Sequence, residues 1–445
     1  MGPCYRLESI TLKDIGIFEH THFDFPPIDS EKKDAEKAEI HIFTGPNGCG
    51  KSTILYALAA IFELAPDDAL ICKRFRSSRS VVAFKFYDEA GYYTRRKNDE
   101  DPFSGLKFGG INEFISTKAA QSLFNHRTAD FDKNDSVSRS TFPFAAFAYS
   151  GNRSPQGVFS VQAIQNIKNS PFEDALSFER TVRPGVLAQW IANNRTKAAL
   201  ARDDGDNTEA LQYDAALKAI SDFIYEICQL KLNFRLKRSP LDVVIEVDGL
   251  AVTFDVLPEG LKSIISWVAD LALRLEDIPF TERRDIFSQP IILFLDEVDI
   301  HLHPKWQRRI LPAVQKLLPN AQVFVSTHSP FVVGSVEDAW VYRLPDAQRK
   351  VLRDPSIAET IIPVASAAGK SYQLILEEVF NVSEQFDVET EALLDDFYCQ
   401  RDAYLKNPAN DRALMMLADS IRERSDELEL IIEMELRQIA RRVKG

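Results

Sequence analysis

The stretch TGPNGCGKST, residues 44–53, decides the fold of this chain. It matches the P-loop pattern G-x-x-x-x-G-K-[ST] at Gly45, Gly50, Lys51 and Ser52. The apolar strand pattern EIHIF precedes it and the helical pattern ILYALAAIFEL follows it, which disfavours a glycine-rich turn that matches by chance. We expect loop N–H groups to wrap phosphates, Lys51 to add charge and Ser52 to ligate Mg²⁺. The predicted nucleotide contacts are Gly45, Pro46, Asn47, Gly48, Cys49, Gly50, Lys51, Ser52 and Thr53.

Two further strand patterns end in polar side chains. In PIILFLDEVD, Asp296 is predicted to hold Mg²⁺ near the P-loop serine, and Glu297 to deprotonate an attacking water. In VFVSTHSPF, His328 is predicted to donate to a γ-phosphate. The alternatives are a strand that simply ends in acidic turn residues and a structural histidine. The P-loop upstream favours the catalytic interpretation of all three.

A second anion site is predicted in LPEGLKSIISWVADL, residues 257–271. A loop with Gly260 opens there into an apolar-striped helix, and the free N–H groups of a helix start attract anions. Pro258, Glu259 and Ser263 complete this candidate site. Because the P-loop already provides one phosphate site, the residues alone leave the identity of this second anion open.

Composition limits the possible partners. The chain has 445 residues, 45% of them apolar, and a formal charge of −13, which argues against binding nucleic acid or anionic membrane over the whole surface. A local basic groove is still compatible with that charge. The five cysteines are scattered without C-x-x-C spacing, and no signal peptide or membrane span is evident. We therefore expect a soluble, cytoplasmic protein.

The order of secondary structure indicates an α/β class. Apolar and polar residues alternate in RLESITLKDIG and THFDF, which predicts strands. From PIILFL to AWVYRL, predicted strands follow predicted helices in turn, as in a parallel sheet. Residues 170–236 are predicted to be mostly helical, and the chain from about Lys370 onward entirely helical. An apolar stripe in this tail, interpreted as core packing or a docking face, comprises Leu414, Leu417, Ile421, Leu428, Ile432, Ile439 and Val443.

Together these motifs resemble the ABC-type ATPases, in their soluble branch with SMC proteins and recombination-nuclease ATPases. The resemblance covers roughly residues 5–345, and Asp299 falls in its D-loop. It implies ATP and Mg²⁺ as cofactors and hydrolysis to ADP and phosphate. It also implies that the helix start at Gly260 faces the γ-phosphate of ATP held by a second copy. The second anion would then be a neighbour's ATP, in a dimer or higher homo-oligomer.

The fold implied by the resemblance is a two-lobed P-loop NTPase head with a mixed sheet core, a helical insertion and an all-helical tail. We expect residues 1–150 to form the N-terminal lobe with the P-loop and 151–240 the helical insertion. Residues 241–365 would form the C-terminal lobe with the remaining motifs. Residues 366–445 would form the tail, available for oligomer or partner contacts.

The chain departs from the ABC pattern at two places. In this family the segment around Gly260 is the signature motif, and Pro258 stands where a serine usually begins it. Proline removes one hydrogen bond to the γ-phosphate, so slow hydrolysis is one expected consequence. No clear glutamine ends the strand pattern FPFAAFAYSGNR. Asn152, Arg153 and Gln156 are the alternatives for that position.

The signature segment, LAQWIANNRTKAAL, LFLDEVDIHLHPKWQ and a short helical tail are similar to the PtuA ATPases of anti-phage Septu systems and some retrons. ATPases of the PARIS system come second. The resemblance implies regulation of an HNH nuclease partner such as PtuB, since no D-x-D or H-N-H arrangement follows His328. The alternative is a DNA-repair ATPase that remodels DNA itself. An HNH reading frame next to the gene would favour the first, and strong stimulation by DNA the second.

Two weaker patterns have ordinary explanations. His301 and His303 have metal-ligand spacing without further ligands nearby, so a structural role beside the D-loop is favoured. DDGDN, residues 203–207, lacks the ordered oxygen ligands of a calcium loop and is interpreted as solvated.

Overall fold

The chain forms two compact units, Met1–Ile375 and Leu376–Gly445. The computed structural model describes residues 5–28, 37–62, 70–77, 80–87, 89–94, 141–151, 159–346, 358–408 and 411–444. Among these residues, no helix combines the length and the apolar character needed to cross a bilayer.

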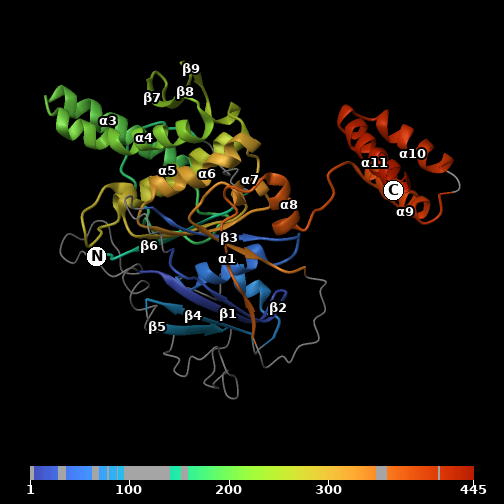
Figure 1. Ribbon diagram of the computed structural model, residues 1–445. Helices are drawn as coiled ribbons and strands as arrows, with labels where there is room; N and C mark the ends of the chain where they lie inside the picture. The colour runs from blue at the N-terminus through green and yellow to red at the C-terminus, as the bar shows by residue number, and fades with distance from the viewer. Residues whose placement is uncertain are drawn as a thin grey trace. The chain divides into compact units, whose positions relative to one another are not determined.

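A six-stranded sheet is the centre of the first unit (Figure 1). Its strands, in spatial order, are β14 (Val364–Ala365), β12 (Ala339–Arg343), β3 (Glu39–Thr44), β11 (Ala321–Ser326), β10 (Ile291–Leu295) and β6 (Ala145–Tyr149). All neighbours from β12 to β6 are parallel, and β14 is antiparallel. Every residue of β6, β10 and β11 is buried, as expected of parallel strands covered on both faces. The parallel order gathers the carboxyl ends of these strands at one edge.

A second, mostly antiparallel sheet lies below the first in Figure 1, with helix α1 (Lys51–Ala60) between them. Its order is β13 (Glu359–Ile361), β2 (Phe18–Asp24), β1 (Leu7–Ile15), β4 (Val81–Phe86) and β5 (Glu89–Thr94). Eight of the ten α1 residues are buried, because the helix packs on both sides. The Tyr93 hydroxyl of β5 donates to Ala57 O of α1 at 2.7 Å. The expected mixed α/β core is confirmed.

Helices cover the other face of the six-stranded sheet (Figure 1). They are α3 (Pro184–Asp203), α4 (Asn207–Cys228), α5 (Glu259–Asp277), α6 (Pro304–Leu317) and the short α7 (Pro330–Val333). α5 and α6 lie nearer the sheet in Figure 1, and α3 and α4 lie outside them: α4 contacts both α5 and α6, and α3 contacts α5.

The prediction that residues 170–236 are mostly helical was wrong at both ends. Residues 171–183 form turns and bends before α3 begins at Pro184. α4 stops at Cys228, where Gln229 takes a left-handed φ of 60°, and Leu232–Arg238 forms strand β7. Leu232 and Phe234 are buried while their neighbours are exposed, which is the alternation of a half-buried strand. β7 pairs with β8 (Leu241–Val247), and β8 with β9 (Leu250–Val252). The expected domain boundary at 240/241 falls inside this hairpin.

The tail consists of helices, as predicted: α8 (Tyr372–Phe380), α9 (Val388–Lys406), α10 (Arg412–Arg422) and α11 (Asp426–Lys444). The second compact unit begins within α8, at Leu376, later than the expected boundary at 365/366. Most of the apolar stripe is used inside this unit. Its members in the unit's own core are Leu414, Ile421, Leu428, Ile432 and Ile439, together with Leu394 and Phe397.

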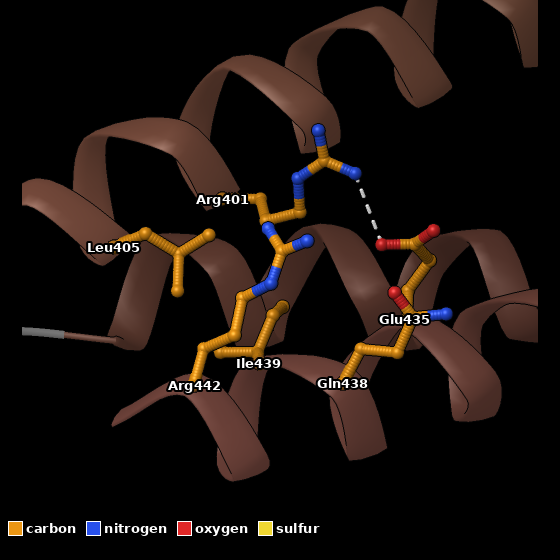
Figure 2. Close-up of a pocket in the computed structure, with 6 residues that line it drawn as sticks. All are labelled: Arg401, Leu405, Glu435, Gln438, Ile439 and Arg442. Atoms are coloured by element: carbon orange, nitrogen blue, oxygen red, sulfur yellow. Dashed lines mark hydrogen bonds and ion pairs between the residues drawn. The ribbon is translucent and has the colours of Figure 1, made fainter. Parts of the chain in front are cut away.

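A small pocket lies between α9 and α11 (Figure 2). An ion pair of 3.0 Å joins Arg401 of α9 to Glu435 of α11 at its rim. The other lining residues are Leu405, Gln438, Ile439 and Arg442. The pocket is therefore a polar indentation between two packed helices.

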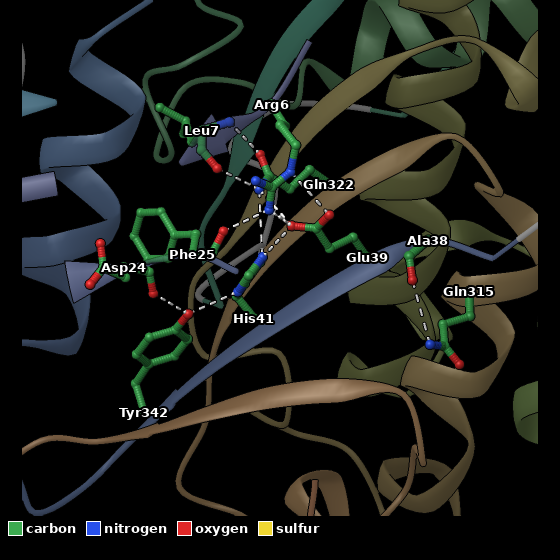
Figure 3. Close-up of polar contacts among 10 residues, drawn as sticks. All are labelled: Arg6, Leu7, Asp24, Phe25, Ala38, Glu39, His41, Gln315, Gln322 and Tyr342. Carbon is green, nitrogen blue, oxygen red and sulfur yellow. Dashed lines mark hydrogen bonds and ion pairs between the residues drawn. The ribbon is translucent and has the colours of Figure 1, made fainter. Parts of the chain in front are cut away.

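A buried polar cluster ties the central strands to the start of the chain (Figure 3). Arg6 pairs with Glu39 of β3 at 2.5 Å, and His41 Nε2 lies 2.6 Å from the same carboxylate. The side chain of Gln322 on β11 bonds both main-chain groups of Leu7. This cluster holds β1 against β3 and β11, immediately upstream of the P-loop.

Burial determines the protonation state of His41, which is fully inaccessible to solvent. Burial lowers the pKa of His41 below its ordinary 6.5, against the opposing hydrogen bond to Glu39. Burial alone would raise the pKa of Glu39, but His41 and Arg6 outweigh it and lower that pKa. The histidine is thus held neutral beside an ionised carboxylate.

Acid should therefore destabilise the first unit through His41. Below pH 6.5 the unfolded chain takes up a proton at this histidine while the folded chain resists it, so stability falls as pH falls. In His41→Gln we expect a lower Tm near neutral pH but a smaller loss of Tm between about pH 7.5 and 5.5. Thermal unfolding followed across that range checks this. Parallel curves for the two proteins would show that His41 does not titrate on unfolding.

Candidate active site

The P-loop leaves β3 at Thr44 and enters α1 at Lys51. Two glycines are required by its path. A Cβ on Gly45 would lie 2.7 Å from Leu344 O, and one on Gly50 would lie 2.6 Å from the Phe18 ring, both at positive φ. The loop thus packs closely against Leu344, directly after β12, and against the β1–β2 turn.

Lys51 closes this loop from inside. Its Nζ donates to Gly45 O at 2.9 Å and to Pro46 O at 3.0 Å, and the side chain is buried. Nζ also lies 3.6 Å from Cys49 Sγ, whose pKa burial raises, so that the thiol adds no negative charge to the loop. A buried ammonium that bonds neutral carbonyls can exchange them for phosphate oxygens.

Asp296, directly after β10, meets the start of α1. Its carboxylate is buried, and its Oδ1 accepts from Ser52 Oγ at 3.2 Å and from Ser326 Oγ at 2.5 Å. A serine hydroxyl beside a carboxylate is the oxygen donor set that Mg²⁺ takes when phosphates complete its coordination.

Glu297 is held by its main chain. It has a left-handed φ of 48°, unusual for a residue other than glycine, and its N–H donates to Ser326 Oγ at 2.7 Å. A Cβ on Gly151, after β6, would lie 2.5 Å from Glu297 Cβ, so only glycine fits beneath it. Partial burial, then the charges of Asp296 and Asp299, raise the pKa of Glu297. A raised pKa makes this carboxylate a stronger proton acceptor.

His328 follows β11 at the same edge, with its side chain exposed. The surrounding protein still removes part of the water around the imidazole, and this desolvation, followed by the positive charge of Lys51, lowers the pKa of His328 below 6.5. The neutral imidazole that results near pH 7 can donate one hydrogen bond. The P-loop, Asp296, Glu297 and His328 thus come from three adjacent parallel strands, β3, β11 and β10.

The predicted signature residues lie at the start of α5. Pro258 is the N-cap and offers no side-chain hydrogen bond to the helix, while Lys262 pairs with Glu259 at 2.9 Å. A Cβ on Gly260 would lie 2.5 Å from His301 O, so this glycine is needed for contact with the segment beside the predicted D-loop residue Asp299. Ser263, one turn on, is buried. Asp299 Oδ1 is hidden from solvent and lacks a hydrogen-bond partner among the described residues.

Residues 40–334 match the family described as AAA domain, putative AbiEii toxin, Type IV TA system. The chain belongs to this AAA family. A second AAA-domain family matches residues 5–66. With the P-loop, Asp296 and Glu297 at one sheet edge, the protein is an ATPase of this family.

Curated relatives carry related names. The chain is 24% identical to the retron Ec83 probable ATPase of Escherichia coli, covering 78% of this chain and 73% of that one. It is 27% identical to the retron Vc95 probable ATPase of Vibrio cholerae, covering 67% and 49%. It is 26% identical to the Septu protein PtuA of Bacillus thuringiensis, covering 39% and 47%. The chain thus spans about half the length of the last two relatives.

Solved structures are similar at a lower level. The SMC head domain from Thermotoga maritima aligns with 81% of this chain and 99% of its own, with a TM-score of 0.39 and 15% sequence identity.

Sequence reasoning missed two residues of this AAA-family site. Ser326 bridges Asp296 and Glu297, and Gly151 packs beneath Glu297. Both follow or end fully buried strands, in VFVST and AAFAYSG, and that position was the available signal. Asn152, Arg153 and Gln156, the alternatives for the missing glutamine, lie outside the described residues.

The weaker candidates have structural roles in the ATPase. His303 caps α6, because its Nδ1 accepts from Lys305 N at 3.2 Å. In the acidic run 203–207, Asp206 caps α4 by accepting from Glu209 N at 2.9 Å.

Removing the Lys51 ammonium should abolish nucleotide binding. We expect Lys51→Ala to weaken ATP affinity by roughly 100-fold or more, because the loop loses the buried ammonium that is predicted to bind phosphate. Titration with a fluorescent ATP analogue measures this. Lys218→Ala, at an exposed lysine of α4, is the control. Equal affinity in both variants would remove Lys51 from the phosphate site.

Proposed function

We propose that this ATPase binds Mg²⁺–ATP between two copies of itself, hydrolyses it with Glu297 as general base, and uses its nucleotide state to regulate a partner nuclease in anti-phage defence. The observation that carries the hydrolytic part is the meeting of Lys51, Asp296 and Glu297 at adjacent strand ends. The similarity to retron ATPases and Septu PtuA supports the defence role.

In the proposed reaction the P-loop amides and Lys51 hold the β- and γ-phosphates. Ser52 and Asp296 hold Mg²⁺, which supplies charge to the phosphates when bound. A water attacks the γ-phosphorus, its proton passes to the Glu297 carboxylate, and the bond from phosphorus to the ADP oxygen breaks. His328, neutral at pH 7, donates to a γ-phosphate oxygen. Pro258 gives the neighbour's phosphate one donor fewer, which is consistent with slow turnover.

Sharing of the nucleotide is supported by how α5 begins. Gly260 packs on His301 O, so the helix start and the D-loop form one continuous surface of the chain. Asp299 Oδ1, without a hydrogen-bond partner among the described residues, belongs to that D-loop. We propose that this surface meets a second copy's ATP, with the amides at the start of α5 directed at the γ-phosphate.

A partner is proposed for DNA cleavage. The described residues contain no cluster of His, Cys, Asp or Glu that could hold the metal of a nuclease. The net charge of −13 argues against DNA binding over the whole surface. An HNH nuclease such as PtuB is the proposed partner, and the C-terminal unit is its proposed docking region. DNA contact at a local groove is compatible with this role.

Replacing the general base should separate binding from hydrolysis. We expect Glu297→Gln to lower kcat by roughly 10²–10⁴-fold while ATP affinity is retained, because the amide cannot accept the proton of water. Glu282→Gln, at an exposed glutamate, is the control for an equal change of charge. Phosphate release and nucleotide titration measure the two effects. Wild-type turnover in Glu297→Gln would show that another residue activates the water.

Two inactive variants should restore each other if the site is shared. Lys51→Ala removes the P-loop charge, and Lys262→Glu places a negative charge on the first turn of α5, where we expect a neighbour's phosphate. Each alone should be inactive, and their mixture should recover hydrolysis at composite sites. Lys316→Glu, at an exposed lysine of α6, is the control. An inactive mixture, with ATP binding intact in Lys262→Glu, contradicts a shared site.

The mass of the complex tests the partner. We expect ATP to increase the mass of Glu297→Gln, and co-expression with an adjacent HNH reading frame to yield one complex. Loss of that complex on removal of residues 376–445, with ATP binding retained, supports docking through the C-terminal unit. Hydrolysis strongly stimulated by DNA, without a nuclease complex, would instead favour the DNA-repair role.

A further inference from the structure

A buried arginine on α5 holds residues 171–181, the segment that lies beside β6. Arg274 is fully inaccessible to solvent, and its guanidinium donates to Pro171 O, Glu173 O and Thr181 O at 2.7–2.8 Å. Its Nε pairs with Asp270, one turn earlier on the same helix, at 2.6 Å. Every bond ends on residues 171–181 or on α5 itself, so Arg274 fastens this segment to the helix that begins at the signature.

The same ion pair reaches the end of β6. The Tyr149 hydroxyl, also fully buried, donates to Asp270 Oδ2 at 3.0 Å. The segment adds main-chain bonds alongside: Ala148 N donates to Ala175 O at 2.8 Å and Ser150 N to Phe178 O at 3.3 Å. The last residues of β6 are therefore held from two sides, by the α5 ion pair and by the segment.

β6 in turn positions the main chain of Asp296 and Glu297. Tyr149 O accepts from Asp296 N at 2.9 Å, and Gly151 lies directly beneath Glu297. Phe178, at a left-handed φ of 59°, packs its ring 4.7 Å from that of Tyr56 on α1. A shift at the end of β6 would therefore move Asp296 and Glu297 together.

Stability alone does not account for this cluster. Apolar residues of similar volume often stabilise a core as well as a buried ion pair does, because both charges must leave water. The charged pair instead fixes positions. The guanidinium is planar and rigid, and it bonds three carbonyls and one carboxylate at once, which sets where those four groups lie. The three carbonyls belong to residues 171–181, which lie beside β6, and the carboxylate of Asp270 accepts a hydrogen bond from Tyr149 of β6.

We propose that the Arg274–Asp270 pair, acting through the Tyr149 hydroxyl, is a positioning device that holds Glu297 where it can take the proton of the attacking water. It rests on the proposed role of Glu297 as general base. Tyr149, Asp270 and Arg274 act through the main chain of Asp296, and none of them needs to touch nucleotide. The device also connects the helix of the signature to the catalytic carboxylate of the same chain.

Tyr149→Phe tests the device with the smallest change. It removes one hydrogen bond and leaves Arg274 paired with Asp270, so the fold should persist. We expect kcat to fall roughly five- to tenfold with ATP affinity within about twofold of wild type, because the base is displaced and the phosphate site is not. Amide exchange at Ser150 and Asp296, measured without nucleotide, should become faster.

Tyr342→Phe is the matched control. Tyr342 is also fully buried, and its hydroxyl donates to the main-chain oxygen of Asp24 at 2.8 Å, in the cluster of Figure 3. It should lose similar stability yet keep kcat and the exchange rates at Ser150 and Asp296. An equal fall of kcat in both variants would mean that general loosening, and not positioning, reduces turnover.

A double variant decides whether Tyr149 acts through Glu297. In the Glu297→Gln background the Tyr149→Phe loss should disappear, whereas independent effects would multiply. Multiplying effects, or wild-type kcat and exchange in Tyr149→Phe, overturn the positioning role while leaving Glu297 as base. Wild-type turnover in Glu297→Gln alone would instead overturn the proposed base. Arg274→Lys, if folded, should behave as Tyr149→Phe does, since ammonium cannot span the same acceptors.

Discussion

The parallel pairing of β3, β11 and β10 is the constraint on which the site depends. Parallel strands end at the same edge, so groups far apart in sequence emerge side by side. Ser52 and Asp296, separated by 244 positions, come within 3.2 Å through this pairing. Ser326 on the middle strand then bonds both Asp296 and the main chain of Glu297. One serine at the sheet edge thereby relates the proposed metal ligand to the proposed base.

Charge inside the first unit occurs where the fold can satisfy it. Lys51 bonds two carbonyls of its own loop, and Arg274 bonds three carbonyls and Asp270. Buried charges are tolerated only with such partners. Glu297 differs, because it combines a left-handed backbone with a raised pKa. Strain and a shifted pKa together at a strand end are typical of a residue kept for chemistry.

The helix of the signature has two ends with different contacts. At its start Gly260 lies against His301, beside the predicted D-loop, and near its end Asp270 and Arg274 hold β6 and residues 171–181. A rigid helix between these points relates the surface proposed for a second copy to the proposed base of its own chain. In the proposed dimer, that geometry would couple binding of the neighbour's ATP to the position of Glu297.

The sequence by itself determined the P-loop, the roles expected of Asp296 and Glu297, the α/β class and the helical tail. Each of these depends on a pattern within one continuous stretch of residues. Sequence patterns failed at β7, where a helical pattern continued past Gln229 into a strand that pairs with β8 and packs on α3 and α4. Tertiary structure alone decided that Ser326 bonds both the Asp296 carboxylate and the main-chain N–H of Glu297, that Gly260 lies against His301 O, and that Tyr149 meets Asp270 across 121 positions. Such contacts depend on sheet order and helix packing, and local periodicity records neither.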